Sequence, residues 1–121
     1  MENKVYDLKK RSYIYALDAI RFLESLPKDY ISQTIGRQLL RSATSIGANI
    51  IEAQASSSKK DFANFYNHSL KSANESKFWL GLLKDSNRVS SEKIGPILNE
   101  TGELANILAS SILTMKGKKK F

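Results

Sequence analysis

The sequence contains no cysteine, and this absence excludes several kinds of chemistry. A chain without thiols cannot form disulfides, thiolate metal sites or a cysteine nucleophile, and such a composition fits a reducing cytoplasm. Proline and glycine are scarce as well, with two and six residues among 121. Because these residues interrupt regular structure, their scarcity predicts long uninterrupted elements.

No long hydrophobic run is present either. No stretch approaches the roughly 18 apolar residues of a membrane-spanning helix, and residues 1–7 lack the apolar core of a signal peptide. The apolar and charged shares, 41% and 26%, are those of a globular protein. We therefore expect a soluble, cytoplasmic protein without membrane association, in which residues 1–121 form a single domain around one core.

Four segments have the apolar spacing that is typical of amphipathic helices. We predict helices over residues 7–26, 32–56, 59–85 and 91–116, and no segment alternates with the period of two that indicates a strand. The predicted connections are only a few residues long. An all-α, antiparallel up-down-up-down four-helix bundle is the simplest fold for such a chain. A short basic tail is expected at residues 116–121.

The same patterns predict how the helices pack. In the third segment, a seam from Phe62 to Leu83 steps alternately by four and three residues over three heptads. Gly47 lies among other small residues in the second segment and predicts a close approach between helices. In the first segment, the expected apolar face consists of Leu8, Ala16, Leu17, Ile20, Leu23 and Leu26.

The predicted topology gathers positive charge at one end of the bundle. At that end the first helix begins, the second helix connects to the third, and the fourth helix ends. Ten basic residues lie at this end against Glu2, Asp7 and Asp61, which accounts for the formal net charge of +7. Besides Lys4, they are the candidate nucleic-acid-binding residues Lys9, Lys10, Arg11, Lys59, Lys60, Lys116, Lys118, Lys119 and Lys120. Such a cluster predicts salt-sensitive phosphate contacts; the alternative is a solvated end that only aids solubility.

A second candidate surface combines polar residues of the second and third helices. Its members recur every three or four residues and are Arg41, Ser45, Asn49, Glu52, Glu75 and Trp79. Because the chain turns near residue 58, residues whose numbers add up to about 116 lie level in an antiparallel pair. We therefore predict a buried or interfacial Arg41–Glu75 pair, which would specify register more than it stabilises. Trp79 is expected to pack in a core or interface, with base stacking as the alternative.

Three stretches carry a family resemblance: residues 38–53 (QLLRSATSIGANIIEA), 58–62 (SKKDF) and 73–80 (ANESKFWL). They resemble the bacterial four-helix-bundle family named after proteins encoded in intervening sequences of 23S ribosomal RNA. The most specific parts are Ser45-x-x-x-Asn49-x-x-Glu52 and Glu75-x-x-x-Trp79-Leu80. Two departures, Ala53-Gln54 in place of a glycine after the glutamate and Asn74 in place of an acid, place the chain in a subgroup.

The resemblance implies an up-down bundle that assembles as a homo-oligomer, commonly a ring-shaped pentamer. The related accessory variability proteins of diversity-generating retroelements bind a reverse transcriptase and nucleic acid through a basic pentameric surface. The resemblance therefore implies RNA or DNA and a protein such as a reverse transcriptase as partners. It assigns no catalytic role to any residue of this chain.

The residues themselves also argue against an enzyme. His68 is the only histidine, it lies one turn from Asn64 and Ser72, and it belongs to no obvious nucleophile–base pair. The Glu-x-x-His motifs of a di-iron bundle are absent, as are His-Glu-x-x-His, a glycine-rich phosphate loop and Gly-x-Ser-x-Gly. We therefore expect no cofactor, no metal and no catalysis. The sequence favours an oligomeric nucleic-acid or ribonucleoprotein accessory module; the alternative is an oligomeric protein-interaction scaffold that binds no nucleic acid.

Overall fold

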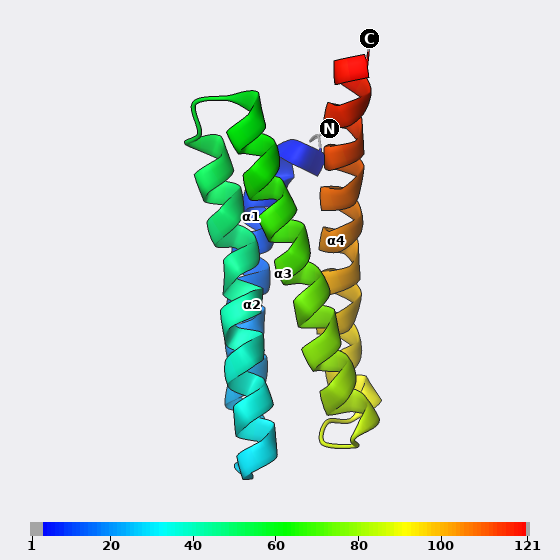
Figure 1. Cartoon of the computed structure of the whole chain (residues 1–121). Coiled ribbons are helices and arrows are strands. Elements are labelled where there is room, and N and C mark those ends of the chain that lie inside the picture. The colour runs from blue at the N-terminus through cyan, green and yellow to red at the C-terminus, as the bar shows by residue number, and fades with distance from the viewer. Residues whose placement is uncertain (1–3, 121) are drawn as a thin grey trace.

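The computed structural model describes the backbone of residues 4–120 and the side chains of residues 8–117. Residues 4–120 form four α-helices: α1 (Lys4–Glu24), α2 (Tyr30–Gln54), α3 (Lys59–Asp85) and α4 (Ser91–Lys120) (Figure 1). This range contains no strand, so the predicted all-α fold is confirmed. Helix α3 has its predicted bounds. Helix α4 continues through residues 117–120, which were predicted to form a tail.

Local sequence signals explain where the helices begin and end. Asp29 caps α2 by accepting a hydrogen bond from the Ser32 amide at 3.0 Å, and Ser58 caps α3 through the Asp61 amide at 3.1 Å. Such caps satisfy amide groups that have no partner within the helix. Helix α1 ends shortly before Pro27, because proline disfavours helical backbone in the residue before it.

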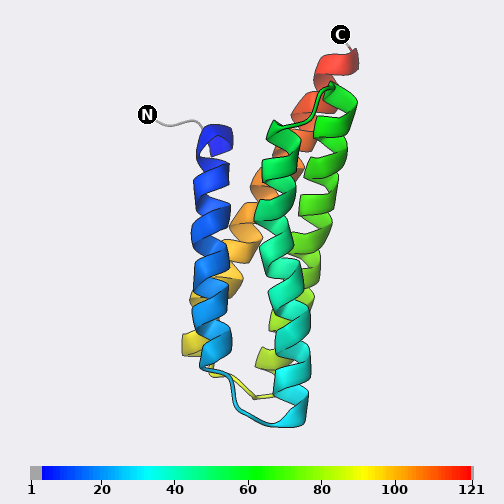
Figure 2. The same ribbon diagram turned by 90° about the vertical axis from the view of Figure 1, so that its left-hand side faces the viewer.

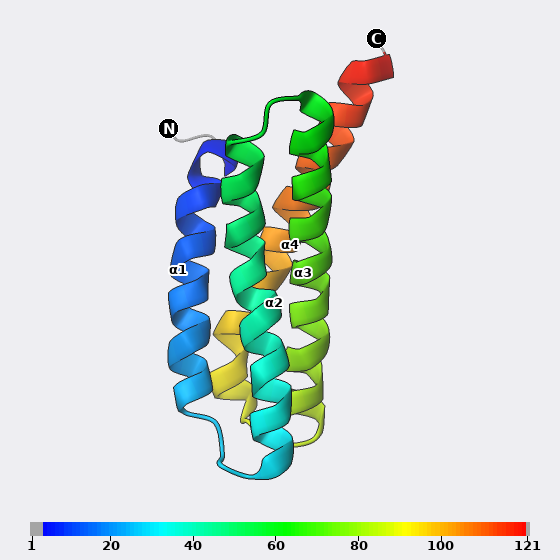
Figure 3. The same ribbon diagram turned by 60° about the vertical axis from the view of Figure 1, so that its left-hand side comes forward.

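The helices pack in the order of an up-down-up-down bundle. Helix α2 lies against α1 and α3, and α4 lies against α3 and α1 (Figures 2 and 3). The predicted seam of α3 lies in the core: Tyr66, Ala73, Leu80 and Leu83 are all buried, with Phe62 packed at its edge. The topology and the packing of the third segment are therefore as predicted.

The predicted buried face of α1 is wrong for most of its length. The residues that reach the core are Leu8, Ser12, Tyr15, Ala19, Phe22 and Leu26, which again step by four and three. Ile20 is 41% exposed, and Leu17 is only half-buried. Apolar side chains lie on two sides of this helix. The true face also contains two hydroxyl residues, Ser12 and Tyr15, so hydrophobicity alone favoured the other side.

One hydroxyl group from each helix lies buried in the middle of the core. The Tyr15 and Thr101 hydroxyl oxygens are 2.7 Å apart, and those of Ser42 and Ser76 are 2.8 Å apart. The two pairs join α1 to α4 and α2 to α3. Because buried polar groups are costly without partners, these hydrogen bonds favour one alignment of the helices along the bundle axis.

Helices α1 and α2 approach closely at Gly47, as predicted. A Cβ atom at this position would lie 3.2 Å from Oγ and 3.5 Å from Cβ of Ser12. The Ser12 hydroxyl donates a hydrogen bond to the Lys9 carbonyl at 2.9 Å. A glycine at position 47 therefore leaves room for the neighbouring helix.

The start of α1, the α2–α3 connection and the end of α4 all lie at one end of the bundle, here called the basic end (Figure 1). All three views show the last turns of α4 extending past the α2–α3 connection. At the opposite end, Arg88 Nε lies 3.5 Å from Asp29 Oδ2, so the two other connections meet there. Within the described residues, none of the helices has the length and apolarity that a membrane span requires.

Candidate binding surfaces

A groove of about 450 Å³ opens at the basic end between the start of α3 and the end of α4. Three lysines contribute to its lining: Lys59 and Lys60 from α3 and Lys116 from α4. All three are exposed. The structure therefore brings together lysines that are more than 55 positions apart in the sequence, and it does so around a concave surface.

The groove also has an apolar part. Phe62 and Ala63 from α3 line it together with Ile112 and Met115 from α4. The Phe62 ring stacks on Tyr66, with ring centroids 4.7 Å apart and an angle of 26° between the planes. Two amide side chains, Asn64 and Asn67, complete the lining. A basic rim around an apolar and aromatic surface is the combination that single-stranded nucleic acids bind.

Two charged residues at the basic end, Arg11 and Glu52, differ from the prediction in their pairing or their location. Arg11 donates hydrogen bonds to both carboxylate oxygens of Glu100, at 2.8 and 3.1 Å, and lies 3.7 Å from Glu103. Its guanidinium is thus already paired with carboxylates, which argues against its predicted role as a phosphate contact. Glu52, exposed in the last turn of α2, lies at the basic end and adds a negative charge that the prediction placed elsewhere.

Among the described side chains, Lys9 and Lys10 are predicted phosphate contacts that do not line the groove. Lys9 and Lys10 are exposed on α1, which packs against α2 and α4. The side chains of Lys4, Lys118, Lys119 and Lys120 lie outside the described residues, as do those of Glu2 and Asp7. The candidate interface for phosphates is therefore centred on Lys59, Lys60 and Lys116.

The predicted pair between Arg41 and Glu75 is present, but it lies on the surface. The Arg41 guanidinium donates a hydrogen bond to Glu75 Oε2, and the same oxygen accepts one from Trp79 Nε1 at 3.0 Å. The Arg41 side chain is 59% exposed and that of Glu75 is 35% exposed, so the pair is not buried within the single chain. The alternative, that the pair lies in an interface between subunits, stays a prediction. The outer side of α2 is open to solvent here, because among the described helices it packs only against α1 and α3.

The remaining polar candidates bond to their own helix. Ser45 Oγ donates to the Arg41 carbonyl at 2.7 Å, and Asn49 Nδ2 donates to the Ser45 carbonyl at 2.8 Å. Glu52 has no such partner among the described residues. The Arg41–Glu75–Trp79 cluster thus forms one unit across two helices, and Ser45, Asn49 and Glu52 continue along α2 without joining it.

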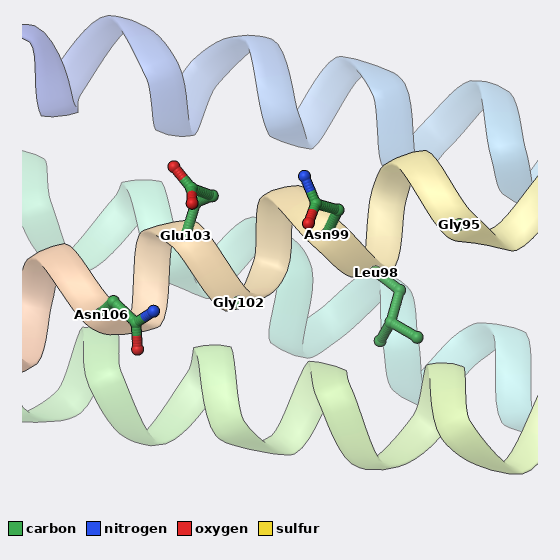
Figure 4. A pocket seen from close by; sticks show the side chains of 6 residues that line it. All are labelled: Gly95, Leu98, Asn99, Gly102, Glu103 and Asn106. Atoms are coloured by element: carbon green, nitrogen blue, oxygen red, sulfur yellow. The ribbon is translucent and has the colours of Figure 1, made fainter.

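A second hollow, of about 400 Å³, lies on the outside of α4. It exists because Gly95 and Gly102 have no side chains, and a Cβ atom at either position would meet nothing within 4 Å. Figure 4 shows Asn99 and Glu103 pointing to one side of the helix and Asn106 to the other. Because these polar groups diverge, the hollow has no centre at which they could bind a common ligand.

Sequence reasoning missed the apolar half of the groove. Phe62 was predicted to lie in the core seam of the third segment, yet Phe62 and Met115 both line the groove. The antiparallel register of the third and fourth segments could have predicted this part of the groove. Because α3 turns into α4 near residue 88, residues whose numbers add up to about 176 lie level. This rule places Lys60 opposite Lys116 and Phe62 near Met115.

Comparisons with known proteins agree with this architecture. The family model described as 23S rRNA-intervening sequence protein matches residues 4–110. A crystal structure from Bacteroides thetaiotaomicron, described as a protein with unknown function from the S23 ribosomal protein family, is 37% identical and superposes with a TM-score of 0.78. The match covers 87% of this chain and 97% of that one. No curated protein matches the chain. Since the family model covers most of the sequence, the chain belongs to the 23S rRNA-intervening sequence protein family.

Proposed function

We propose that this protein is a non-catalytic, oligomeric accessory module that binds nucleic acid through its basic end. The observation that carries the proposal is the groove lined by Lys59, Lys60 and Lys116. Asp61 is the one acidic residue in the first turn of α3, so lysines outnumber acids around the groove.

The charge of this end supports phosphate contacts more than recognition of base sequence. Lysine ammonium groups on flexible stems make point contacts with phosphates and carry little sequence information. Contacts of this kind do not distinguish the two nucleic acids, so RNA and DNA are both candidate partners. Binding of this kind weakens with salt, by about 0.7 to 0.9 logarithmic units of affinity per contact for each tenfold increase in salt.

A charge-matched pair of variants tests the proposal. In the groove variant, Lys59, Lys60 and Lys116 become Gln; in the control variant, Lys28, Lys84 and Lys93 become Gln. The control lysines are exposed and lie near the other end of the bundle, so both proteins lose three charges. Fluorescence anisotropy with structured RNA and duplex DNA over a salt series should show a loss of about two to three units of salt slope in the groove variant alone.

Two results would contradict the proposal. If wild-type protein binds neither nucleic acid at low salt, the basic end has no such role. If both variants weaken binding equally, the contacts come from overall charge and not from the groove. The first result would favour a protein-interaction scaffold without nucleic-acid binding, and the second would remove the groove from the proposal.

The oligomeric part of the proposal is supported by an apolar stripe on the outside of α1. Tyr13, Leu17 and Ile20 follow one another at helical spacing, and Tyr13 is 68% and Ile20 41% exposed. Contiguous exposed apolar side chains are characteristic of interaction surfaces. The family resemblance makes a homopentamer the expected assembly, and this stripe is the face that we propose for the contact between subunits.

Native mass spectrometry can test the assembly. The change Tyr13→Glu should shift the protein to lower oligomeric states, because it would bury a charge in the proposed contact. The matched control is Leu113→Glu on α4, since Leu113 is also 68% exposed. A monomeric wild-type protein, or an equal effect of both substitutions, would contradict self-association through α1.

A further inference from the structure

We infer that the groove between α3 and α4 accepts an unpaired base, so that the protein selects single-stranded segments over duplex. This inference rests on the proposed function and adds what the apolar half of the groove does. Lysines alone would explain attraction to any phosphate backbone. They would not explain why the concave surface between them is formed by Phe62, Ala63, Ile112 and Met115.

The dimensions of the groove suit one nucleotide. Ligand pockets of small molecules span about 300 to 1,000 Å³, and this groove has about 450 Å³. A base inside a duplex is already stacked on both faces, and it cannot enter without being pulled out of the helix. An unpaired base has free faces and enters without that cost. The shape therefore favours loops, bulges and single strands.

The groove supplies the contacts that an unpaired base uses. Phe62 offers an aromatic ring whose orientation is held by its stacking on Tyr66. Asn67 Nδ2 donates to the Ala63 carbonyl at 3.1 Å, and the amide oxygen of this lining residue, which has no partner among the described residues, can accept a hydrogen bond. Lys59, Lys60 and Lys116 line the same groove and can supply ammonium groups to the phosphates. Stacking on an aromatic ring tolerates every base, so we expect discrimination of strandedness and little preference for sequence.

The charges that line the groove indicate which class of ligand it binds. An apolar groove without charge would suit a peptide helix. Here three cations line the groove, and Asp61 next to Lys60 is the one acid in the first turn of α3. An anionic chain that carries flat apolar groups satisfies both halves of the lining. Nucleic acid without a partner strand has that chemistry.

The test compares three probes of equal length, about eight nucleotides, with the full-length protein. They are a single-stranded oligonucleotide, an abasic oligomer with the same sugar-phosphate backbone, and a duplex. Methyl-¹³C labelling of methionine reports the groove directly, because the sequence holds only Met1 and Met115 and the second lines the groove. A Met115→Leu sample assigns the signal.

We expect the single strand to bind at least about tenfold more tightly than the abasic oligomer, which corresponds to the contribution of one stacked base. The Met115 methyl signal should shift with the single strand and stay in place with the abasic oligomer and the duplex. Filling the groove with Ala63→Leu should reduce single-strand affinity to that of the abasic oligomer. The control Ala48→Leu, at an exposed position of α2, should not.

The outcomes separate this inference from the proposed function. If abasic and normal oligomers bind equally, or the Met115 signal does not move, the groove inference is overturned while phosphate binding stands. If none of the probes binds at low salt, both are overturned. The methyl measurement uses wild-type protein, so it decides the question even if Ala63→Leu fails to fold.

Discussion

The hydroxyl groups of Tyr15 and Thr101 lie 2.7 Å apart in the core and join the first helix to the fourth. Thr101 Oγ1 also donates its proton to the Ile97 carbonyl at 2.6 Å. A threonine hydroxyl has one proton, so Tyr15 is the donor in the contact between the two side chains. This hydrogen bond is therefore a specific link between α1 and α4.

The change Tyr15→Phe tests that link. We expect it to lower the free energy of unfolding by about 1 kcal/mol, the usual net contribution of one hydrogen bond. The matched control is Tyr66→Phe. Tyr66 is equally buried, at 1% exposed, and its hydroxyl has no hydrogen-bond partner among the described side chains. Urea denaturation of both variants should show the larger loss for Tyr15→Phe; equal losses would mean that the link contributes nothing.

Stability should fall in alkaline solution. Burial raises the pKa of Tyr15 above its ordinary value of 10.0, with hydrogen bonds to Thr101 and Ser76 opposing the rise, and burial also raises that of Tyr66. Because each folded-state pKa is raised, the stabilisation is complete below pH 10 and is lost as pH increases through the folded-state pKa.

The measurement is the free energy of unfolding between about pH 8 and pH 12. We expect Tyr15→Phe to have a shallower decline above pH 10 than wild-type protein. Tyr30→Phe serves as a control, because Tyr30 is 80% exposed. An identical decline in all three proteins would show that ionisation of the buried tyrosines does not cause the loss of stability at high pH.

The stability of the protein at acidic pH should depend on Asp29. Hydrogen bonding from Ser32, with a smaller contribution from the Arg88 charge, lowers the pKa of Asp29 below its ordinary value of 3.8. A lowered pKa contributes stability that is present above the unfolded-state value and is lost as pH falls through the folded-state value.

Thermal unfolding of Asp29→Ala and Asp29→Asn should reveal this dependence. At neutral pH, alanine should lower the melting temperature more than asparagine, since asparagine still caps the helix. The difference between wild type and Asp29→Asn should shrink as pH falls below 3.8. A difference that is constant with pH would assign the effect to the cap alone.

Removing the charge of Glu75 should change the surroundings of Trp79 more than it changes stability. The Trp79 indole donates a 3.0 Å hydrogen bond to Glu75, and Trp79 is the only tryptophan. We expect Glu75→Gln to shift its fluorescence emission and to cost less than about 1 kcal/mol, because exposed ion pairs contribute little. Unchanged emission would contradict the hydrogen bond in solution. Lys77→Gln, an exposed change on the same helix, is the control.

Substitution by alanine should change the stability of the protein differently at two glycines. Around Gly102 a Cβ atom meets nothing within 4 Å, so Gly102→Ala should raise stability by up to about 1 kcal/mol through helix propensity. At Gly47 the new atom would lie 3.2 Å from Ser12 Oγ, so Gly47→Ala should gain less or lose stability. Chemical denaturation checks both, and an equal gain at the two sites would argue against close packing of α1 on α2.

The sequence predicted much of the fold because the third and fourth segments have one apolar side each. It failed on α1, where the true stripe includes Ser12 and Tyr15 and a competing set contains Leu17 and Ile20. Apolar content cannot choose between two such sides. Both sides have the same helical spacing, so the choice between them depends on the packing of α1 against α2 and α4.

The candidate sites were predictable to different extents. Antiparallel register placed Arg41 opposite Glu75, because that argument needs only the position of one turn. It could not show how exposed the pair is, since exposure depends on how α1 and α3 are arranged around α2. The pairing of Arg11 with Glu100 joins residues 89 positions apart across the first and fourth helices, and it follows only from three-dimensional packing.

Both short connections at the far end of the bundle meet through Arg88 and Asp29, whereas the groove lies at the other end of α3 and α4. Because the helices are long, a small change in the angle between two of them displaces their ends by a large distance. Over about 40 Å of helix, a change of about 5° in the angle between α3 and α4 displaces their free ends by about 3.5 Å. That displacement is close to the thickness of one stacked base, about 3.4 Å. A change of this size in the angle between α3 and α4 would therefore alter the width of the groove by about the thickness of one base.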